Sequence, residues 1–495
     1  MRCAGQTALE DKPPADCSFR FFGARLGRGM GGFMKSTRAR SIVVYILAAA
    51  FLAGLIFFVV RLFLSGQDWA TSSINDHLSH AGQLSAAGKV LDRDGEILAQ
   101  TVDGQRVYHE DETVRRALMQ TVGDSTTYIS TAVQTAFRSD LVGYNPITGI
   151  SLSQLFQTGN DMTLTVDADV SAAALQALGN RNGAVAVYNY ETGEILCMVS
   201  TPTYDPANRP DVENDTTGQY EGVYLNKALS GTFTPGSTFK VITSAAAIEN
   251  LPDLYSRTFT CNGSVVINGE QITCHSVHGQ LTFQDALAQS CNVAFAELAV
   301  ELGKDKLTET AQRLGCNQSF SIDGLPTAAS SYDVSDATEN SLAWSGVGQY
   351  TDLVNPMHMM ILMGAIARGG TPVNPYLISQ VSTPLGFGGR TGQTTLGETM
   401  LEESTATQLR DVMRYAVQTS YGDGMFPNLT VCAKTGTGEV GEGKQPNGWM
   451  VGFTLDADCP LAFAVVVENG GSGISSAGPV ASSVLQAAAA AVRGQ

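Results

Sequence analysis

The stretch Gly231-Thr232-Phe233-Thr234-Pro235-Gly236-Ser237-Thr238-Phe239-Lys240 carries the most information in this chain. Pro235 and Gly236 predict a turn, and the alanine-rich run that follows predicts a helix opened by Ser237. Residues three apart on a helix share a face, so the Ser237 hydroxyl and the Lys240 amine are expected to meet. A serine needs a neighbouring base to act as a nucleophile, and burial can lower the pKa of a lysine far enough for that task. A lone Ser-x-x-Lys is more often a surface helix, so the prediction depends on partner motifs.

The second motif is Ser290-Cys291-Asn292. Thr282 followed by Asp285 predicts a helix start before it. An apolar helical face is predicted after it, formed by Phe295, Leu298, Ala299 and Leu302. The motif is therefore expected at the turn between two helices. There, the Ser290 hydroxyl can relay a proton and the Asn292 amide can hold a substrate carbonyl.

The third motif is Lys434-Thr435-Gly436-Thr437, which ends a β-prone run from Leu429 to Ala433. Further strands are predicted at 449–453 and 461–467. Gly436 lets a substrate backbone approach the strand closely, and the charge and hydroxyls of the other three residues suit a carboxylate. An edge strand with a solvated lysine is the alternative interpretation.

Ser-x-x-Lys, Ser-x-Asn and Lys-Thr-Gly in this order are the signature of penicillin-binding proteins and class A β-lactamases. The chain resembles a class B penicillin-binding protein, a monofunctional D,D-transpeptidase of the bacterial cell wall, from its apolar N-terminal segment onward. Further segments similar to that family are Leu164-Thr165-Val166-Asp167, Gly183-Ala184-Val185-Ala186-Val187, Glu191-Thr192-Gly193-Glu194-Ile195-Leu196, Asn226-Lys227-Ala228-Leu229 and Gly346-Val347-Gly348-Gln349.

The resemblance implies acyl transfer from the D-Ala-D-Ala end of a peptidoglycan stem peptide through a serine acyl-enzyme, without a cofactor. Ser237 is then the nucleophile, Lys240 its base, and Ser290 with Lys434 the route by which the leaving group gains a proton. β-Lactams are expected to trap Ser237. A polytopic membrane glycosyltransferase is the expected protein partner.

The same resemblance assigns substrate binding to four further residues. Asn292 orients the substrate amide, Thr435 and Thr437 hold its carboxylate, and Gly436 lines the approach. The backbone N–H groups of Ser237 and Thr437 are expected to hold the oxyanion.

The N-terminal part predicts a single membrane anchor. Residues 42–64 are almost wholly apolar and long enough to span a bilayer. Basic residues precede the run and acidic residues follow it, which places the N-terminus in the cytoplasm and the rest outside the membrane. A cleaved signal peptide is the alternative. Residues 1–33 lack periodicity, and we expect translation to begin at Met30 or Met34.

The chain has 495 residues and a net charge of −17, which argues against nucleic acid as a partner. We predict a cytoplasmic segment at 1–40, an anchor at 41–64, a pedestal domain at 65–161 and a transpeptidase domain at 162–495. A hairpin from Lys89 to Leu98 opens the pedestal. Strands at both ends of the last domain, a helical block from Ser237 to Met413 and a C-terminal helix from Val484 to Val492 predict an α+β fold with an antiparallel sheet.

The cysteines divide into two groups. Cys197, Cys316, Cys432 and Cys459 lie in apolar contexts and are predicted core residues. Cys261 and Cys274 flank a short hairpin, and we predict a disulfide between them, with a Cys274–Cys291 bridge as the competing pair. The set Cys261, Cys274, His275 and His278 has the wrong spacing for common zinc sites, so no metal is predicted.

Two other functions compete with the transpeptidase. A membrane-anchored β-lactamase or β-lactam sensor shares two of the motifs, although no residue clearly supplies the extra carboxylate base of class A hydrolases. A non-catalytic scaffold of a cell-wall synthesis complex is the other alternative, which the three intact motifs disfavour.

Overall fold

The computed structural model describes residues 37–71, 84, 87–145, 150–151, 158–384, 386, 389–441 and 443–494. The chain divides into two compact units, 1–66 and 67–495. Most of helix α2 (Thr37–Thr71) lies in the first unit, and its segment Arg40–Arg61 is long and apolar enough to cross a membrane. Apolar side chains from Ile42 to Val60 are exposed along it. The predictions for residues 1–33 lie outside the described residues.

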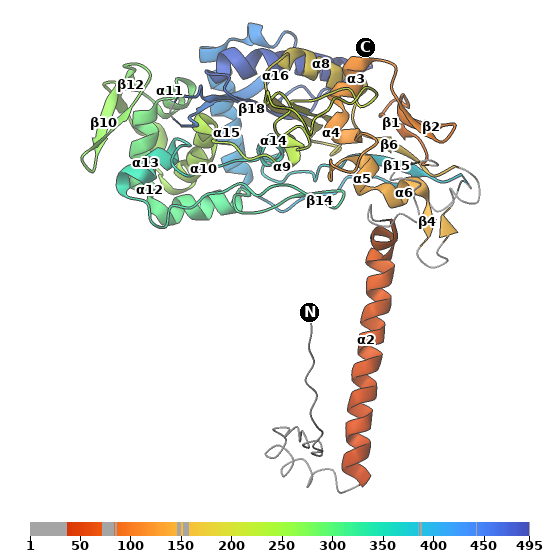
Figure 1. Cartoon of the computed structure of the whole chain (residues 1–495). Helices are drawn as coiled ribbons and strands as arrows, with labels where there is room; N and C mark the ends of the chain where they lie inside the picture. Colours follow the sequence, from red (N-terminus) through yellow and green to blue (C-terminus); the bar gives the residue numbers. More distant parts are fainter. Residues whose placement is uncertain are drawn as a thin grey trace, which may run out of the picture. The chain divides into compact units, whose positions relative to one another are not determined.

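A five-stranded antiparallel sheet lies in the second unit, and its strand order is β17-β18-β19-β7-β8. Figure 1 labels its strand β18. Its strands are β7 (Gly183–Asn189), β8 (Ile195–Thr201), β17 (Val431–Gly438), β18 (Asn447–Thr454) and β19 (Leu461–Val467). The strands predicted from the sequence are confirmed. β17, which carries the Lys-Thr-Gly motif, is an edge strand.

Helices cover both faces of this sheet. Along β19, Leu461, Phe463 and Val465 pack with α16 (Gly473–Arg493) and α8 (Ala168–Leu178). The alternate residues Ala462 and Ala464 pack on the other face with α14 (Pro356–Ala367). Because both faces are buried, the strand is a continuous apolar run in the sequence.

Helix α16 is longer than the predicted helix, which began only at Val484. It starts at Gly473 and contains Pro479. Glycine, serine and proline lower the helix propensity of this first half. Burial of Ala477, Val480 and Ala481 against the sheet stabilises the helix there in spite of that propensity.

A second sheet has the order β16-β15-β6-β1-β2-β3. Its strands are β1 (Val90–Leu91), β2 (Ile97–Val102), β3 (Gln105–Tyr108), β6 (Asp161–Leu164), β15 (Ile378–Ser382) and β16 (Arg390–Thr391). The predicted β1–β2 hairpin is confirmed: the Asp92 carboxylate accepts the N–H groups of Asp94 and Glu96, at 3.0 and 2.8 Å. Because β15 and β16 lie within the predicted transpeptidase segment, this sheet joins it to the predicted pedestal. The boundary at 161 stays a prediction.

The predicted helical block contains short strands as well as helices. Its main helices are α10 (Lys240–Asn250), α11 (Phe283–Ala288), α12 (Asn292–Arg313), α13 (Glu339–Gly346) and α15 (Glu403–Ala416). β10 (Ser264–Ile267) and β11 (Glu270–Thr273) form the hairpin predicted between Cys261 and Cys274, and β9 (Phe259–Cys261) pairs with β12 (Gly279–Leu281). The capping box of Thr282 and Asp285 is confirmed at α11. The four predicted core cysteines are buried.

The remaining elements are short. They are α3 (Glu112–Ala117), α4 (Met119–Val122), α5 (Val133–Ala136), α6 (Arg138–Val142), β4 (Tyr144–Asn145), β5 (Ile150–Ser151), α9 (Lys227–Ser230), η4 (Leu254–Ser256), β13 (Ser321–Ile322), β14 (Leu325–Pro326) and η6 (Asp423–Met425).

His358 of α14 predicts a pH-dependent contribution to stability. Its Nε2 donates to the Leu314 carbonyl at 2.7 Å, its Nδ1 lies 2.5 Å from Ser330 Oγ, and burial lowers its pKa to about 4. Below pH ~6.5 this histidine binds a proton in the unfolded chain but stays neutral in the folded protein. The folded protein therefore loses stability as the pH falls from ~6.5 to about 4. We expect His358→Gln to remove ~2 kcal/mol of this loss between pH 7 and 4.5, measured by denaturant unfolding. Parallel pH dependences of the variant and the natural protein would contradict the assignment.

Candidate active site

Ser237 lies on a tight 3₁₀ turn, η3 (Gly236–Phe239), which runs directly into α10 at Lys240. The sequence predicted an α-helical start here. Side chains three apart on a 3₁₀ helix are eclipsed, so Ser237 and Lys240 still share one face. Gly236 has a φ of +53°, a conformation that favours glycine. Within the described part of the chain, the Ser237 hydroxyl forms no hydrogen bond, and it lines the cavity described below.

Close contacts between backbones fix this turn. Gly236 N–H donates to the Gly348 carbonyl at 2.9 Å, and a Cβ at Gly348 would lie 1.9 Å from Gly236 O. A Cβ at Gly436 would lie 2.5 Å from Pro235 O. The glycine of the Lys-Thr-Gly motif is therefore required by the protein's own turn, which is a different reason from the substrate approach expected from the sequence.

Two lysine amines meet at one hydroxyl. Lys434 Nζ lies 3.0 Å from Ser290 Oγ, and Lys240 Nζ lies 3.3 Å from the same atom. Lys240 also donates to the Ser290 carbonyl at 2.7 Å and to Asn292 Oδ1 at 2.8 Å, and Lys434 donates to the Thr435 carbonyl at 2.8 Å. The structure thus brings together one residue or more from each of the three motifs.

Burial changes the protonation of this pair. Both lysines are fully buried. Burial, together with the charge of Lys434, lowers the pKa of Lys240 well below its usual range, and burial lowers the pKa of Lys434 to about 7. A neutral Lys240 amine donates to its two carbonyl partners and accepts the Ser290 O–H. A charged Lys434 then donates to Ser290 Oγ, so a proton path runs from Lys434 through Ser290 to Lys240.

The Ser-x-Asn motif lies between α11 and α12, as predicted. Ser290 has a φ of +55°, a strained backbone conformation for a residue with a side chain. Asn292 is the first residue of α12, and its Nδ2 donates to the Thr273 carbonyl of β11 at 2.8 Å. One asparagine therefore connects Lys240 to the β10–β11 hairpin.

Some backbone N–H groups of the edge strand β17 point away from β18. Thr435 N–H and Oγ1 both donate to the Tyr421 hydroxyl, each at 3.2 Å. N–H groups two residues apart in a strand point to the same side, so Thr437 N–H also points to the open edge. Tyr421 ends the π-helical turn η5 (Val417–Tyr421) and belongs to none of the motifs, so nothing in the sequence marked it.

A cavity of about 1280 Å³ lies over these groups. Its lining includes the predicted residues Ser237, Ser290, Asn292, Thr435, Gly436 and Thr437. Lys240 and Lys434 are buried beneath it. Glu439 is the one carboxylate among the described residues of the lining, and it is exposed.

Cys261 and Cys274 are free cysteines in the structure. The disulfide between them stays a prediction. Cys274, His275 and His278 line one side of the cavity, next to the Ser-x-Asn motif.

Comparison with known proteins identifies the family. Residues 183–486 match the penicillin-binding protein transpeptidase domain. This chain belongs to that family. It is 29% identical to the peptidoglycan D,D-transpeptidase PbpA of Mycolicibacterium smegmatis, over 82% of this chain and 87% of that protein.

Solved structures of the family have the same fold. Penicillin-binding protein A from Mycobacterium tuberculosis, as a ceftriaxone acyl-enzyme complex, superposes with a TM-score of 0.72 at 26% identity, over 82% of this chain and 99% of that chain. The D,D-transpeptidase domain of a peptidoglycan glycosyltransferase from Eggerthella lenta gives 0.72 at 28% identity, over 83% and 99%. The predicted α+β transpeptidase fold is confirmed.

The contact between Gly236 and Gly348 yields a stability prediction. Gly348 has a φ of +85°, so an alanine there is strained by its backbone as well as by the Gly236 carbonyl. We expect Gly348→Ala to lower the free energy of unfolding by ~3 kcal/mol. Gly424→Ala is the matched control, because a Cβ there meets no atom within 4 Å. Equal stability of the two variants would contradict the packing argument.

Proposed function

We propose that this protein is a serine-type peptidoglycan D,D-transpeptidase that crosslinks stem peptides and is acylated by β-lactams. The observation that carries the proposal is the pair of buried amines that share Ser290 Oγ beneath a cavity lined by Ser237. The relatives named as D,D-transpeptidases, and the acyl-enzyme complex of a structural neighbour, support it.

The first half of the reaction is acylation. Ser237 Oγ attacks the carbonyl carbon of the penultimate D-Ala, and its proton passes to the neutral Lys240 amine. The peptide bond to the terminal D-Ala breaks. The leaving nitrogen takes a proton from Ser290, which Lys434 replenishes.

The second half is transfer. An amine from a neighbouring stem peptide attacks the acyl-enzyme ester and gives up one proton through Ser290 to the neutral Lys434. The new amide bond forms, the ester bond breaks, and Ser237 leaves with the proton returned from Lys240. Both steps pass through an oxyanion, which the backbone N–H groups of Ser237 and Thr437 hold. The orientation of Thr437 N–H toward the open edge supports this role.

Substrate binding involves the remaining predicted residues and Tyr421. One Asn292 Nδ2 proton is bound to Thr273, so the second is free to donate to the substrate carbonyl. Tyr421 accepts two hydrogen bonds from Thr435, so its own proton is free to donate to the terminal carboxylate, beside Thr435 and Thr437. Gly436 lines the approach of the donor strand.

The proposed setting is the outer face of the cytoplasmic membrane. Helix α2 supplies a single-pass anchor, and the basic residues before it support a cytoplasmic N-terminus. Residues 65–161 then form the pedestal, and 162–495 form the transpeptidase domain. A polytopic glycosyltransferase as partner rests on the resemblance to class B enzymes.

Covalent labelling tests the nucleophile. We expect a fluorescent penicillin to label the full-length protein in detergent at Ser237 and to leave Ser237→Ala unlabelled. Ser237 lines the cavity on the same face of its turn as Lys240, whereas the Ser290 hydroxyl already lies between two amines. Gel fluorescence and mass spectrometry of the labelled peptide measure this. Ser335→Ala is the matched control, since Ser335 is exposed and outside the cavity lining.

The same experiment separates the competing functions. A transpeptidase keeps the label for many minutes, whereas a hydrolase releases it rapidly. Rapid release that Glu439→Gln abolishes would assign a β-lactamase, because Glu439 is the available carboxylate among the described lining residues. Cell-wall activity that survives Ser237→Ala would assign a scaffold.

The lysine pair predicts a bell-shaped pH profile for acylation. As the pH falls through the lowered pKa of Lys240, its amine gains a proton and loses its function as base, so the rate falls. Above pH ~7, Lys434 loses the proton that it supplies through Ser290, so the rate falls about tenfold for each further pH unit. We expect Lys434→Arg to remove the alkaline limb, whatever its absolute rate, because arginine stays charged. Exposed Lys306→Arg is the control that should keep it.

A further inference from the structure

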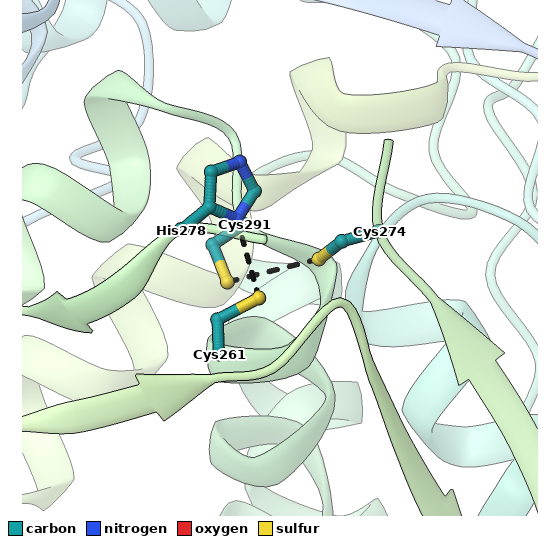
Figure 2. Close-up of side chains that lie close together, drawn as sticks. All are labelled: Cys261, Cys274, His278 and Cys291. Atoms are coloured by element: carbon teal, nitrogen blue, oxygen red, sulfur yellow. Dashed lines mark hydrogen bonds between the residues drawn. The ribbon is translucent and has the colours of Figure 1, made fainter. Parts of the chain in front are cut away.

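Four metal-ligating side chains converge beside the Ser-x-Asn motif (Figure 2). Cys261 ends β9, Cys274 follows β11, His278 precedes β12 and Cys291 precedes α12. Their three sulfur atoms and one ring nitrogen all lie within 4.8 Å of one another. Cys261 and Cys291 are buried, and Cys274 and His278 are half-buried.

The distances fit a tetrahedral metal site. Bonds of about 2.3 Å to sulfur and about 2.0 Å to nitrogen put the edges of a zinc tetrahedron at about 3.8 Å between sulfurs and about 3.5 Å between sulfur and nitrogen. Cys274 Sγ lies 3.8 Å from Cys291 Sγ, and Cys261 Sγ lies 3.3 Å from His278 Nδ1. A disulfide needs a separation of about 2.05 Å, so this arrangement suits a metal better than a bond between two sulfurs.

Backbone N–H groups donate to two of the three sulfur atoms. Cys274 Sγ accepts the N–H groups of Asn292 and Val293, at 3.0 and 3.3 Å, and Cys291 Sγ accepts the Ala294 N–H at 3.5 Å. These donors form the first turn of α12, whose dipole also favours negative charge. N–H donors of this kind orient metal ligands and tune their charge.

Strand pairing assembles the set from residues far apart in the sequence. Twelve residues separate Cys261 from Cys274, three separate Cys274 from His278, and twelve separate His278 from Cys291. β9 pairs with β12 so that Cys261 faces Gly279, next to His278. Cys274 N–H donates to the Gly263 carbonyl at 2.8 Å, which brings Cys274 back beside Cys261.

We propose that Cys261, Cys274, His278 and Cys291 bind one zinc ion. Three thiolates and one imidazole fill all four positions, which is typical of a structural site rather than a catalytic one. The prediction of no metal is thereby revised. The sequence-based prediction included His275, which is exposed, and left out Cys291. Cys291 is further along the chain and already belonged to the Ser-x-Asn motif.

The proposed zinc site lies next to the Ser-x-Asn motif of the active site. Cys291 lies between Ser290 and Asn292, and oxygen atoms of both residues accept hydrogen bonds from Lys240. A metal bond at Cys291 would hold the strained Ser290 backbone and fix the β9–β12 strands to α12. This second role rests on the proposed transpeptidase function, whereas zinc binding does not.

Metal content tests the site directly. We expect about one zinc per chain in full-length protein purified in detergent without chelator, measured by mass spectrometry of the elements. Cys261→Ser and His278→Ala should retain less than a tenth of it, and Cys197→Ala, a buried cysteine outside the cluster, should retain all of it. Cobalt added to metal-free natural protein should give thiolate charge-transfer absorption, which covers the case in which a variant fails to fold. No zinc or cobalt uptake by reduced protein, or a Cys274–Cys291 disulfide in unreduced peptide maps, would overturn the proposal.

Penicillin acylation then tests the positioning role. We expect metal-free protein to be acylated at least tenfold more slowly, with recovery on adding zinc. His278→Cys keeps four ligands and should keep both zinc and rate, whereas His278→Ala should lose both. An unchanged rate in metal-free protein would refute the positioning role. Zinc bound to a protein that penicillin never labels would refute the transpeptidase and leave the metal site standing.

Discussion

The burial of two lysine amines around one serine hydroxyl is the constraint on which the rest of this structure depends. Removing an ammonium group from water costs several kcal/mol unless its hydrogen bonds are replaced. The chain replaces them with the Ser290 and Thr435 carbonyls, Asn292 Oδ1 and Ser290 Oγ. Two charges so close repel each other, so the pair favours holding one proton fewer, which leaves a neutral base beside a charged donor.

The edge position of β17 is the second constraint. An unpaired strand edge usually exposes N–H groups that attract other strands. In this protein the Tyr421 hydroxyl covers Thr435 N–H, while Thr437 N–H faces the cavity. On the same strand, Gly436 and Gly438 lack side chains where the backbone of the turn that carries Ser237 approaches them. The strand can therefore hold the turn tightly and still present polar groups to a bound peptide.

The sequence was informative where local pattern and function coincide. The three motifs, the central strands and the capping box at Thr282 could all be predicted, because each depends on residues close together in the chain. The first half of α16 could not, since tertiary burial overrides its weak helix propensity. The role of Tyr421 and the cluster of Cys291 with Cys261, Cys274 and His278 were missed for another reason. Thr435 lies 14 residues from Tyr421, and the partners of Cys291 lie 13 to 30 residues from it. No periodicity in the sequence indicates contacts over such separations.

Asn292 links the β10–β11 hairpin directly to the buried Lys240. Its Oδ1 accepts from Lys240, its Nδ2 donates to Thr273 of β11, and its backbone N–H donates to Cys274 Sγ. A shift of the β10–β11 hairpin therefore moves the partner of Lys240 without any intermediate side chain. Because packed contacts of this kind deform little before they break, a shift of Cys274 Sγ or of the β10–β11 hairpin also shifts the Asn292 oxygen that accepts from Lys240.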